Sequence, residues 1–343
     1  PGSDTLTGRG RRARPGAGLF SSTAADATSE DSPRGVSTGW TYPEWDDNRH
    51  EYRAAWCTVS DEEPAAREGE PLPSPDVHAL RRPLTRLGGG LDTWHRQAHG
   101  DDIDIDSAVE CLVDIRAGAA GDFDVYLESR RSRRDLSAHI LLDVSGSSAE
   151  PGSGGRTVHQ HQMAAAHALA VALHELGDRV ALSAFRSHGR GSVQVIPVLR
   201  FGEPVGTEMG RRLAALSPGA YSRLGAAIRH GAPVLSGRGG TARRLLVVIS
   251  DGLAYDHGYE RAYGCADARR ALAETRRHGT GCLALTIGAD TRADDLGKVF
   301  GSAAHASIPR AEDLADVIGP LLRSALHTAD LRRRVTRLGH STS

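Results

Sequence analysis

From about residue 136 onward, short apolar runs alternate with longer segments of helical character. The apolar runs predict strands at 137–143, 179–185, 192–200, 243–250 and 281–287, with a weaker strand at 303–308. Helices are expected near 157–177, 205–216, 223–236, 264–279, 292–299 and 312–328. Continuously apolar strands that alternate with helices form a mostly parallel sheet covered on both faces. The pattern therefore predicts a doubly wound α/β domain over residues 136–330.

The rest of the chain differs from this domain in composition. Residues 1–39 are rich in Gly, Ser, Thr, Ala, Arg and Pro without apolar periodicity, which predicts disorder. Residues 40–135 are expected to form an amino-terminal extension. Within it, 76–118 has helical patterning, with apolar positions at Leu80, Leu84, Leu87 and Leu91. Residues 331–343 are expected to be a tail.

An aromatic segment opens the extension. Trp40, Tyr42, Trp45, Tyr52 and Trp56 fall within 17 positions and include three of the four tryptophans. Such a cluster forms either a packed patch that docks the segment onto a domain or a partner-binding surface, because aromatic residues are enriched in interface anchors. The sequence leaves both interpretations open.

An Asp-rich stretch at 101–106 raises the possibility of a calcium site. It lacks the Gly and Glu that an EF-hand loop needs at its sixth and twelfth positions. We expect it instead to cap the helix that carries Val109, Leu112 and Ile115, since Asp is favoured at the positive amino end of a helix.

Charge and cysteine usage exclude several classes of protein. The formal charge is −1, from 42 basic and 43 acidic residues, which argues against a general nucleic-acid or membrane-surface binder. The four cysteines form no Cys-x-x-Cys pair, so a zinc or redox site is not expected, and they fit a reducing, cytoplasmic compartment. No apolar stretch reaches the roughly 18–20 residues of a membrane span, which predicts no direct membrane insertion.

The strand at 137–143 ends in an Asp-x-Ser-x-Ser loop. Asp143 supplies a carboxylate, and Ser145 and Ser147 supply two hydroxyls. This is an oxygen-only set of ligands, which a hard cation such as Mg²⁺ prefers. Two later loops offer matching groups: the hydroxyl of Ser222 before a helix, and the carboxylate of Asp251 after an apolar run. Ligands of parallel sheets bind beyond the carboxyl ends of the strands, so the two carboxylates are expected to meet there.

These three loops, in this order, resemble the metal-ion-dependent adhesion site (MIDAS) of von Willebrand factor A (VWA) domains, whose fold is Rossmann-like. The resemblance implies that one Mg²⁺ or Mn²⁺ is held by Asp143, Ser145, Ser147, Ser222 and Asp251. Ser222 stands where the family usually has Thr. It keeps the hydroxyl but lacks the methyl group that helps to fix the rotamer. A coordination position left open would accept a carboxylate from another protein.

Further segments resemble NorD/CbbO-type proteins. They are Trp40–Asp46, Trp56–Val59, Asp104–Asp106, Val113–Gly118, Pro218–His230 and the region from Asp251 to Asp267. Known members activate nitric oxide reductase or Rubisco beside a separate MoxR-type AAA+ ATPase. The resemblance implies a non-enzymatic, cytoplasmic adaptor that binds an acidic residue of a client protein, with Tyr221, Tyr255 and Asp256 on the rim of its site.

The sequence leaves two other functions open. One is a VWA scaffold without an ATPase partner. The other is a serine hydrolase with Ser145 as nucleophile, although the Gly-x-Ser-x-Gly elbow is absent. His139, His161 and His257 have no spacing typical of a general base and are expected on the surface or on a helix face. The glycine-rich Gly152–Thr157 stretch does not match a P-loop, so nucleotide hydrolysis by this chain is not expected.

Overall fold

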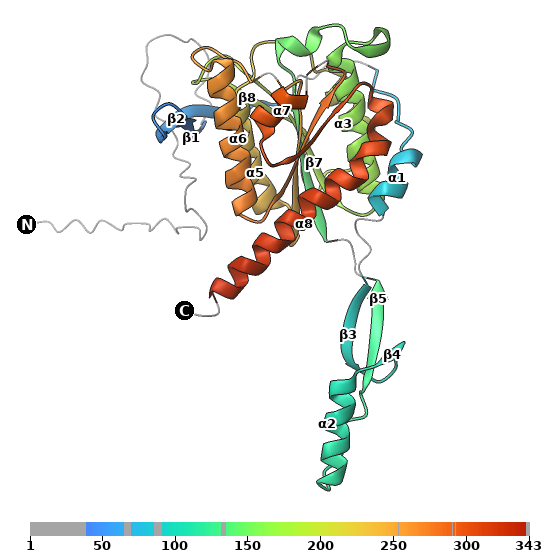
Figure 1. Ribbon diagram of the computed structural model, residues 1–343. Helices are drawn as coiled ribbons and strands as arrows, with labels where there is room; N and C mark the ends of the chain where they lie inside the picture. Colours follow the sequence, from blue (N-terminus) through green and yellow to red (C-terminus); the bar gives the residue numbers. More distant parts are fainter. Residues whose placement is uncertain are drawn as a thin grey trace, which may run out of the picture.

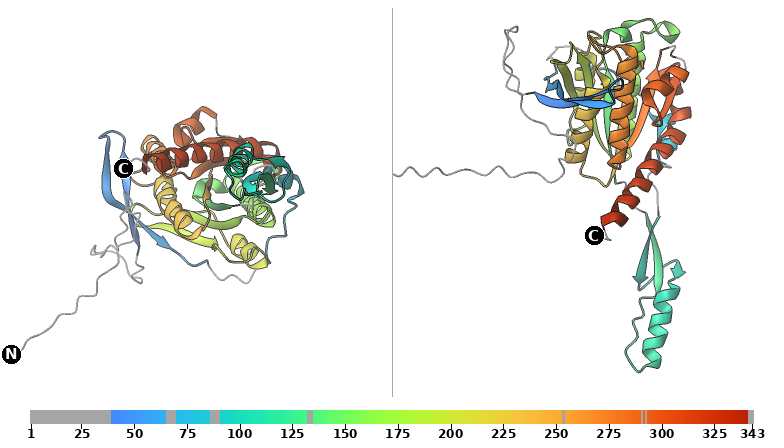
Figure 2. Two further views of the ribbon diagram at one scale, coloured as in Figure 1. Left: turned by 90° about the horizontal axis from the view of Figure 1, so that it is seen from below. Right: turned by 60° about the vertical axis from the view of Figure 1, so that its left-hand side comes forward.

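The computed structural model describes residues 39–64, 70–85, 91–131, 135–252, 254–289, 291 and 293–340. It consists of a body built on an eight-stranded sheet and a smaller arm, residues 91–131, that projects from the body (Figure 1). The right-hand view of Figure 2 also shows the arm projecting beyond the body. The segment 1–39, expected to be disordered, lies outside the described residues except for Gly39.

The sheet of the body has the strand order β1-β2-β8-β7-β6-β9-β10-β11. Its strands are β1 (Trp40–Asp46), β2 (Glu51–Asp61), β6 (Leu136–Asp143), β7 (Arg179–Ser187), β8 (Val193–Leu199), β9 (Arg243–Ile249), β10 (Gly281–Ile287) and β11 (Ala304–Ile308). From β7 through β11 along this order every pair is parallel, whereas β8 is antiparallel to β7. The predicted doubly wound α/β fold and its mostly parallel sheet are confirmed.

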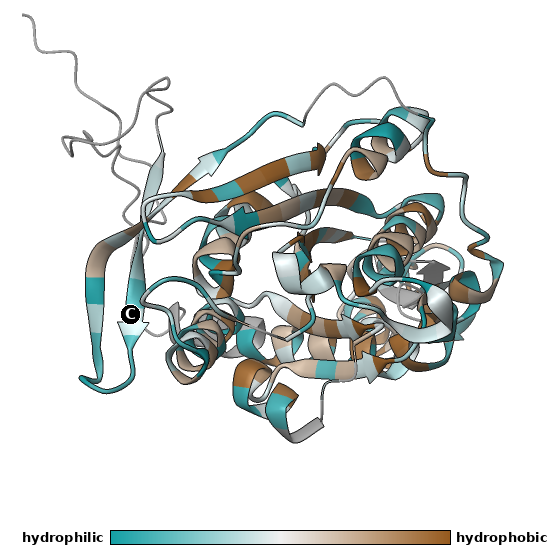
Figure 3. Cartoon of the chain, turned by 90° about the horizontal axis from the view of Figure 1, so that it is seen from above, coloured by the Kyte–Doolittle hydropathy of each residue, from teal (hydrophilic) through white to brown (hydrophobic). Residues whose placement is uncertain are grey.

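Helices cover both faces of the sheet. One layer contains α1 (His78–Thr85), α3 (Val158–Glu175), α4 (Thr207–Ala214) and α8 (Leu314–His340), and the other contains α5 (Leu224–Arg238), α6 (Arg261–Arg277) and α7 (Ala293–Phe300). Strand β6 explains the unbroken apolar run: Ile140 and Leu142 pack into the first layer, and Leu141 packs into the second. Figure 3 shows such apolar strands enclosed by helices with hydrophilic outer faces.

The aromatic segment belongs to the body. Its hairpin, β1 and β2, extends the sheet, because β2 pairs in parallel with β8 from Val59 opposite Val193. Tyr42 is buried, and the backbone N–H of Trp45 donates to Asp267 Oδ1 on α6 at 2.8 Å. The hairpin is therefore part of the α/β body rather than of a separate extension. Of its aromatic side chains, Tyr42 is buried in the body and Trp40 remains 37% exposed.

The arm has its own small sheet, in the order β3-β5-β4, and one helix. Its elements are β3 (Leu91–Gln97), β4 (Asp102–Ile103), α2 (Ile105–Arg116) and β5 (Tyr126–Arg131). The helical pattern expected over 76–118 is thus interrupted, since Leu91 begins a strand. Asp104 caps α2 as expected, accepting from the N–H of Ser107 at 3.4 Å. Nine of the twelve exposed large apolar side chains of the described residues lie here, so α2 buries little of its apolar surface.

The carboxyl-terminal helix is longer than expected. The pattern predicted a helix at 312–328 and a tail from 331, whereas α8 continues to His340. Its earlier turns pack Leu314, Ile318 and Leu322 against the sheet. Among the described helices, none combines the length and the apolar character needed to cross a membrane.

Candidate metal centre

Asp143 and Asp251 lie at the ends of neighbouring strands. β6 and β9 are paired in parallel with Leu142 opposite Ile249, so the chain leaves both strands at the same edge of the sheet. Both carboxylates are buried, with exposed fractions of 1% and 3%. The juxtaposition expected from the two apolar runs is therefore present.

The carboxylate of Asp143 receives hydrogen bonds from all three loops. Its Oδ1 accepts from the backbone N–H of Ser145 at 2.9 Å. Its Oδ2 accepts from the hydroxyls of Ser222 at 2.7 Å and Ser250 at 2.9 Å. The hydroxyls of Ser145 and Ser147 lie 3.2 Å apart in the first loop. The structure thus gathers three hydroxyl-bearing loops around one buried carboxylate.

The charge of this cluster is not balanced by a basic side chain at Asp143. Burial, and next the negative charge of Asp251, raise the pKa of Asp143 from 3.8 to about 7. In the described chain, no Lys, Arg or His lies within ion-pair distance of Asp143. A nearby cation would lower the free energy of the ionised form, since it offsets both the desolvation and the repulsion between the carboxylates.

The donor set suits a hard divalent cation. The described residues contain no cluster of three or more His, Cys, Asp or Glu side chains that could hold a metal, so hydroxyl groups would have to contribute to any shell at this centre. Asp143 and Asp251 supply two carboxylates, and the serine hydroxyls supply neutral oxygens. Mg²⁺ is commonly held by one or two carboxylates and keeps several water molecules. The residues present therefore fit such an ion.

Buried ion pairs hold the second loop in place. Arg223, next to Ser222, contacts Glu44 on β1 and Asp256, with Nε 3.1 Å from Asp256 Oδ2. Its Nη2 also donates to the carbonyl of His257 at 2.8 Å. The backbone N–H of Ser222 donates to the carbonyl of Tyr255 at 2.9 Å. Because these contacts fix the backbone on both sides of Ser222, its hydroxyl is oriented toward Asp143.

Two residues of the centre were not identified from the sequence. Ser250 adjoins Asp251, and its hydroxyl could have been suspected from that position alone. Gln162 lies fully buried on α3, where nothing in the local pattern distinguishes it. In the amide orientation that satisfies its partners, its nitrogen donates to the carbonyl of Asp143 at 3.2 Å, and its oxygen accepts from the N–H of Asp251 at 3.1 Å. Gln162 thus links the loops that carry Asp143 and Asp251 through their backbones.

An aromatic cavity of about 510 Å³ opens on one side of the centre. It is lined by Ser145, Gly146, Ser147, Ala220, Tyr221, Ser222, Tyr255 and Arg261. The rings of Tyr221 and Tyr255 pack edge to face, 5.9 Å apart, and Tyr255 is 51% exposed. Asp256 does not lie on this rim, contrary to expectation: it is 1% exposed, because its carboxylate pairs with Arg223 and accepts from the N–H of Gly189.

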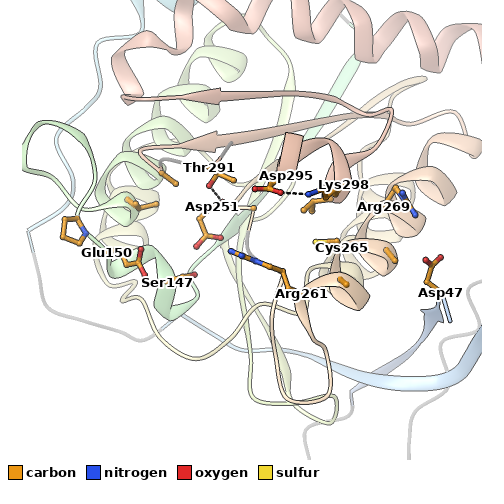
Figure 4. A pocket seen from close by; sticks show the side chains of 17 residues that line it. Asp47, Ser147, Glu150, Asp251, Arg261, Cys265, Arg269, Thr291, Asp295 and Lys298 are labelled. Atoms are coloured by element: carbon orange, nitrogen blue, oxygen red, sulfur yellow. Dashed lines mark hydrogen bonds and ion pairs between the residues drawn. The ribbon is translucent and has the colours of Figure 1, made fainter. Parts of the chain in front are cut away.

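A larger cavity of about 780 Å³ lies on the other side. It reaches from Ser147 and Asp251 along α6 to α7, and its lining includes Arg261, Cys265, Arg269 and Lys298. Figure 4 shows Arg261 extending from α6 toward Asp251. Arg261 lines both cavities, so it lies beside the centre at the place where the two cavities adjoin.

Of the three histidines, His257 is exposed and His161 lies on α3, in line with the expectation of a surface or helix-face position, whereas His139 lies buried on β6. His139 is 1% exposed, 3.1 Å from the carbonyl of Gly231 and 3.0 Å from the hydroxyl of Ser183, and its burial lowers its pKa to about 4. His161 is also buried and contacts the carbonyl of Ser153. Among the described residues, the hydrogen-bond partner of the Ser145 hydroxyl is Ser147 rather than a histidine. This arrangement does not resemble an activated serine nucleophile.

The curated proteins similar to this chain include several that are named NorD. No family model matches the sequence. Among curated proteins, NorD of Brucella suis is 33% identical over 274 residues, which covers 78% of this chain and 43% of that protein. NorD of Stutzerimonas stutzeri is 30% identical, covering 83% and 47%, and an uncharacterised protein of Pseudomonas aeruginosa is 34% identical, covering 86% and 48%. The chain spans about half the length of the curated relatives it matches.

Similar solved structures include proximal thread matrix protein 1 from the mussel byssus, at 13% identity and a TM-score of 0.41, covering 56% of this chain and 47% of that one. Another is a von Willebrand factor type A protein from Catenulispora acidiphila, at 19% identity and a TM-score of 0.38, covering 59% and 43%. The part of this sequence that is similar to NorD proteins includes the three loops around Asp143. Over the half of the NorD length that it spans, the chain is a VWA-domain protein of the NorD type.

Proposed function

We propose that this chain is a metal-dependent adaptor that captures a client protein through an acidic side chain. The observation that supports this most directly is the buried pair Asp143 and Asp251, surrounded by hydroxyls and bordered by two cavities. A divalent cation, Mg²⁺ or Mn²⁺, would be held by Asp143, Ser145, Ser147, Ser222 and Asp251. When bound, it supplies a positive charge that a client carboxylate can coordinate.

The residues of the chain perform recognition in this proposal, without bond cleavage. Asp143 and Asp251 balance the charge of the ion, while the neutral hydroxyls complete its shell without adding negative charge. Tyr221 and Tyr255 limit the access of water to one side, which strengthens the attraction between ion and carboxylate. The hydrogen bonds of Asp143 keep the ligands in place before the client arrives, so less ordering is needed on binding.

The wider role follows from the resemblance to NorD/CbbO-type proteins. In it, the adaptor works in the cytoplasm with a separate MoxR-type AAA+ ATPase, which supplies the force that activates or assembles the client. The absence of a P-loop motif from the sequence agrees with a separate motor. An adjacent gene for a MoxR-type ATPase would favour this role over that of a scaffold without an ATPase.

The test is client capture with and without chelator. Purified nitric oxide reductase and Rubisco serve as the two clients, and Asp143→Ala is compared with the wild type. Asp295→Ala is the matched control, because Asp295 lines the larger cavity but is exposed and pairs with Lys298. We expect Mg²⁺-dependent retention of one client by the wild type and the control, and loss of retention and of client activation in Asp143→Ala. Normal activation by a folded Asp143→Ala would contradict the metal bridge.

A further inference from the structure

The two cavities that flank the metal centre differ in chemistry. The smaller one has the aromatic walls of Tyr221 and Tyr255, and Tyr255 is half exposed. The larger one has a basic wall on α6. The larger cavity also contains acidic residues, but Asp295 pairs with Lys298, and the α6 wall itself presents arginines. A segment bound across the metal centre would therefore meet aromatic rings on one side and the α6 arginines on the other.

The basic wall consists of Arg261 and Arg269, two turns apart on one face of α6 with Cys265 between them. Both arginines are exposed, and neither forms an ion pair or hydrogen bond with another described residue. This distinguishes them from Lys298 in the same cavity, whose charge is taken up by Asp295 at 2.8 Å. Two guanidinium groups thus remain available for an anionic ligand from outside.

Arg261 is the better placed of the two. It lines both cavities and extends toward Asp251 (Figure 4). A divalent cation held by Asp251 would neutralise that carboxylate and reduce its attraction for Arg261. The guanidinium would then be free to pair with a carboxylate of the client, and paired N–H donors suit that group well.

We propose that the client segment carries two acidic residues, one for the metal ion and one for the α6 arginines, together with an apolar or aromatic residue for the Tyr221–Tyr255 cavity. This rests on the proposed function and extends it by defining the chemistry of the ligand. Because Arg269 lines only the larger cavity, an acidic residue that reaches it lies on the opposite side of the metal-bound carboxylate from the apolar residue. Arg261 acts as a specificity-determining residue and Arg269 extends the same surface.

The experiment is a selection of random displayed peptides on the full chain with Mg²⁺, with release by chelator. Wild type is expected to enrich peptides with an apolar residue and two acidic positions. Arg261→Ala combined with Arg269→Ala is expected to lose enrichment of the second acidic position and to keep the first. Tyr255→Ala is expected to lose the apolar position. Arg277→Ala, an exposed arginine at the far end of α6 outside the cavity, is the control and should match the wild type.

A synthetic pair of peptides then measures the effect. The selected peptide and a version with the second acidic residue changed to Gln are titrated against wild type and Arg261→Ala. Changing either the second acidic residue of the peptide or Arg261 is expected to weaken binding about tenfold. Changing both is expected to weaken binding no more than either single change, because the two groups contact each other. The inference would be overturned if the wild type enriched peptides with only one acidic position, or if the variant lacking both arginines still enriched the second acidic position. Either result would leave metal capture intact. Chelator-insensitive binding would instead contradict the proposed function.

Discussion

Buried acids occur in two different settings in this protein. Beside α5 and α6, four of them contact arginines: Glu44 and Asp256 surround Arg223, and Asp267 and Glu274 surround Arg229. At the ends of β6 and β9, Asp143 contacts an N–H group and two hydroxyls, and its nearest charge is the carboxylate of Asp251. The acids of both settings lie within one body, and all of them are buried.

The difference concerns the balance of charge. In the arginine clusters every acid contacts a guanidinium group of the chain, and these contacts join β1 to α5 and α5 to α6, so they stabilise the fold. Asp143, by contrast, has no Lys, Arg or His within ion-pair distance in the described part of the chain, and a neighbouring carboxylate raises its pKa. Burial of acids alone therefore does not indicate a binding site, whereas burial without a basic partner does.

The largest expected effect comes from breaking an arginine cluster. Arg229→Met leaves Asp267 and Glu274 buried without their shared partner, and removal of one member of a buried ion pair costs about 3–5 kcal/mol. Urea unfolding measures the loss, and the exposed Arg277→Met should stay within about 0.5 kcal/mol of the wild type. A loss below about 1 kcal/mol in Arg229→Met would show that these acids do not depend on the arginine.

The pH dependence of stability should separate the Asp143 cluster from the arginine clusters. The pKa of Asp143 is about 7 in the folded chain and 3.8 in the unfolded reference, so only the folded chain binds this proton between those values. In chelator, ionisation of Asp143 therefore costs stability that grows as the pH rises from about 4 and is complete above about 7, by an amount on the order of a few kcal/mol.

The corresponding measurement is urea unfolding across that pH range for wild type and Asp143→Asn. The wild type is expected to lose stability relative to Asp143→Asn as the pH rises, and Asp295→Asn should follow the wild type. Parallel curves for wild type and Asp143→Asn would mean that Asp143 does not experience the repulsion described here.

Next in size is the effect of Gln162 on metal affinity. Gln162→Leu removes the amide that connects the backbone of Asp143 to that of Asp251, without removing a proposed ligand. Residues that orient metal ligands typically contribute 10–100-fold to affinity. Calorimetry with Mn²⁺ should show a loss of that size in a variant that urea unfolding shows to be folded. Unchanged affinity would mean that the loops hold their positions without this link.

The smallest expected effect concerns Ser222. Ser222→Thr introduces the residue that VWA domains usually have, and its methyl group restricts the rotamer of the hydroxyl. We expect metal binding to become about two- to fivefold tighter, as measured by the same titration. Markedly weaker binding would show that the buried space beside Ser222 cannot accept a methyl group.

The sequence was most informative where local pattern and topology agree. The strands that end at Asp143 and Ile249 were predicted because both of their faces are buried, and the ends of adjacent parallel strands must meet. The assembly of Asp143 and Asp251 follows from that rule, without knowledge of any contact between them. The cap of α2 at Asp104 was likewise predicted from a local signal.

The features that were missed depend on distant contacts. The hairpin β1–β2 is held by Asp267, which lies 222 residues beyond Trp45, so its place in the sheet could not be inferred from its own pattern. Asp256 was expected on the rim because its partner Arg223 could not be foreseen. Gln162 has no local signal, because its role exists only once α3 lies across the ends of β6 and β9.

The central claim is that the Asp143 cluster requires a cation. Calorimetric titration of the full chain with Mg²⁺ and Mn²⁺, for wild type, Asp143→Ala and the control Asp295→Ala, tests it most directly. We expect the wild type and the control to bind one ion and Asp143→Ala to bind none. Absence of binding in the wild type, or equal binding by Asp143→Ala, would contradict it.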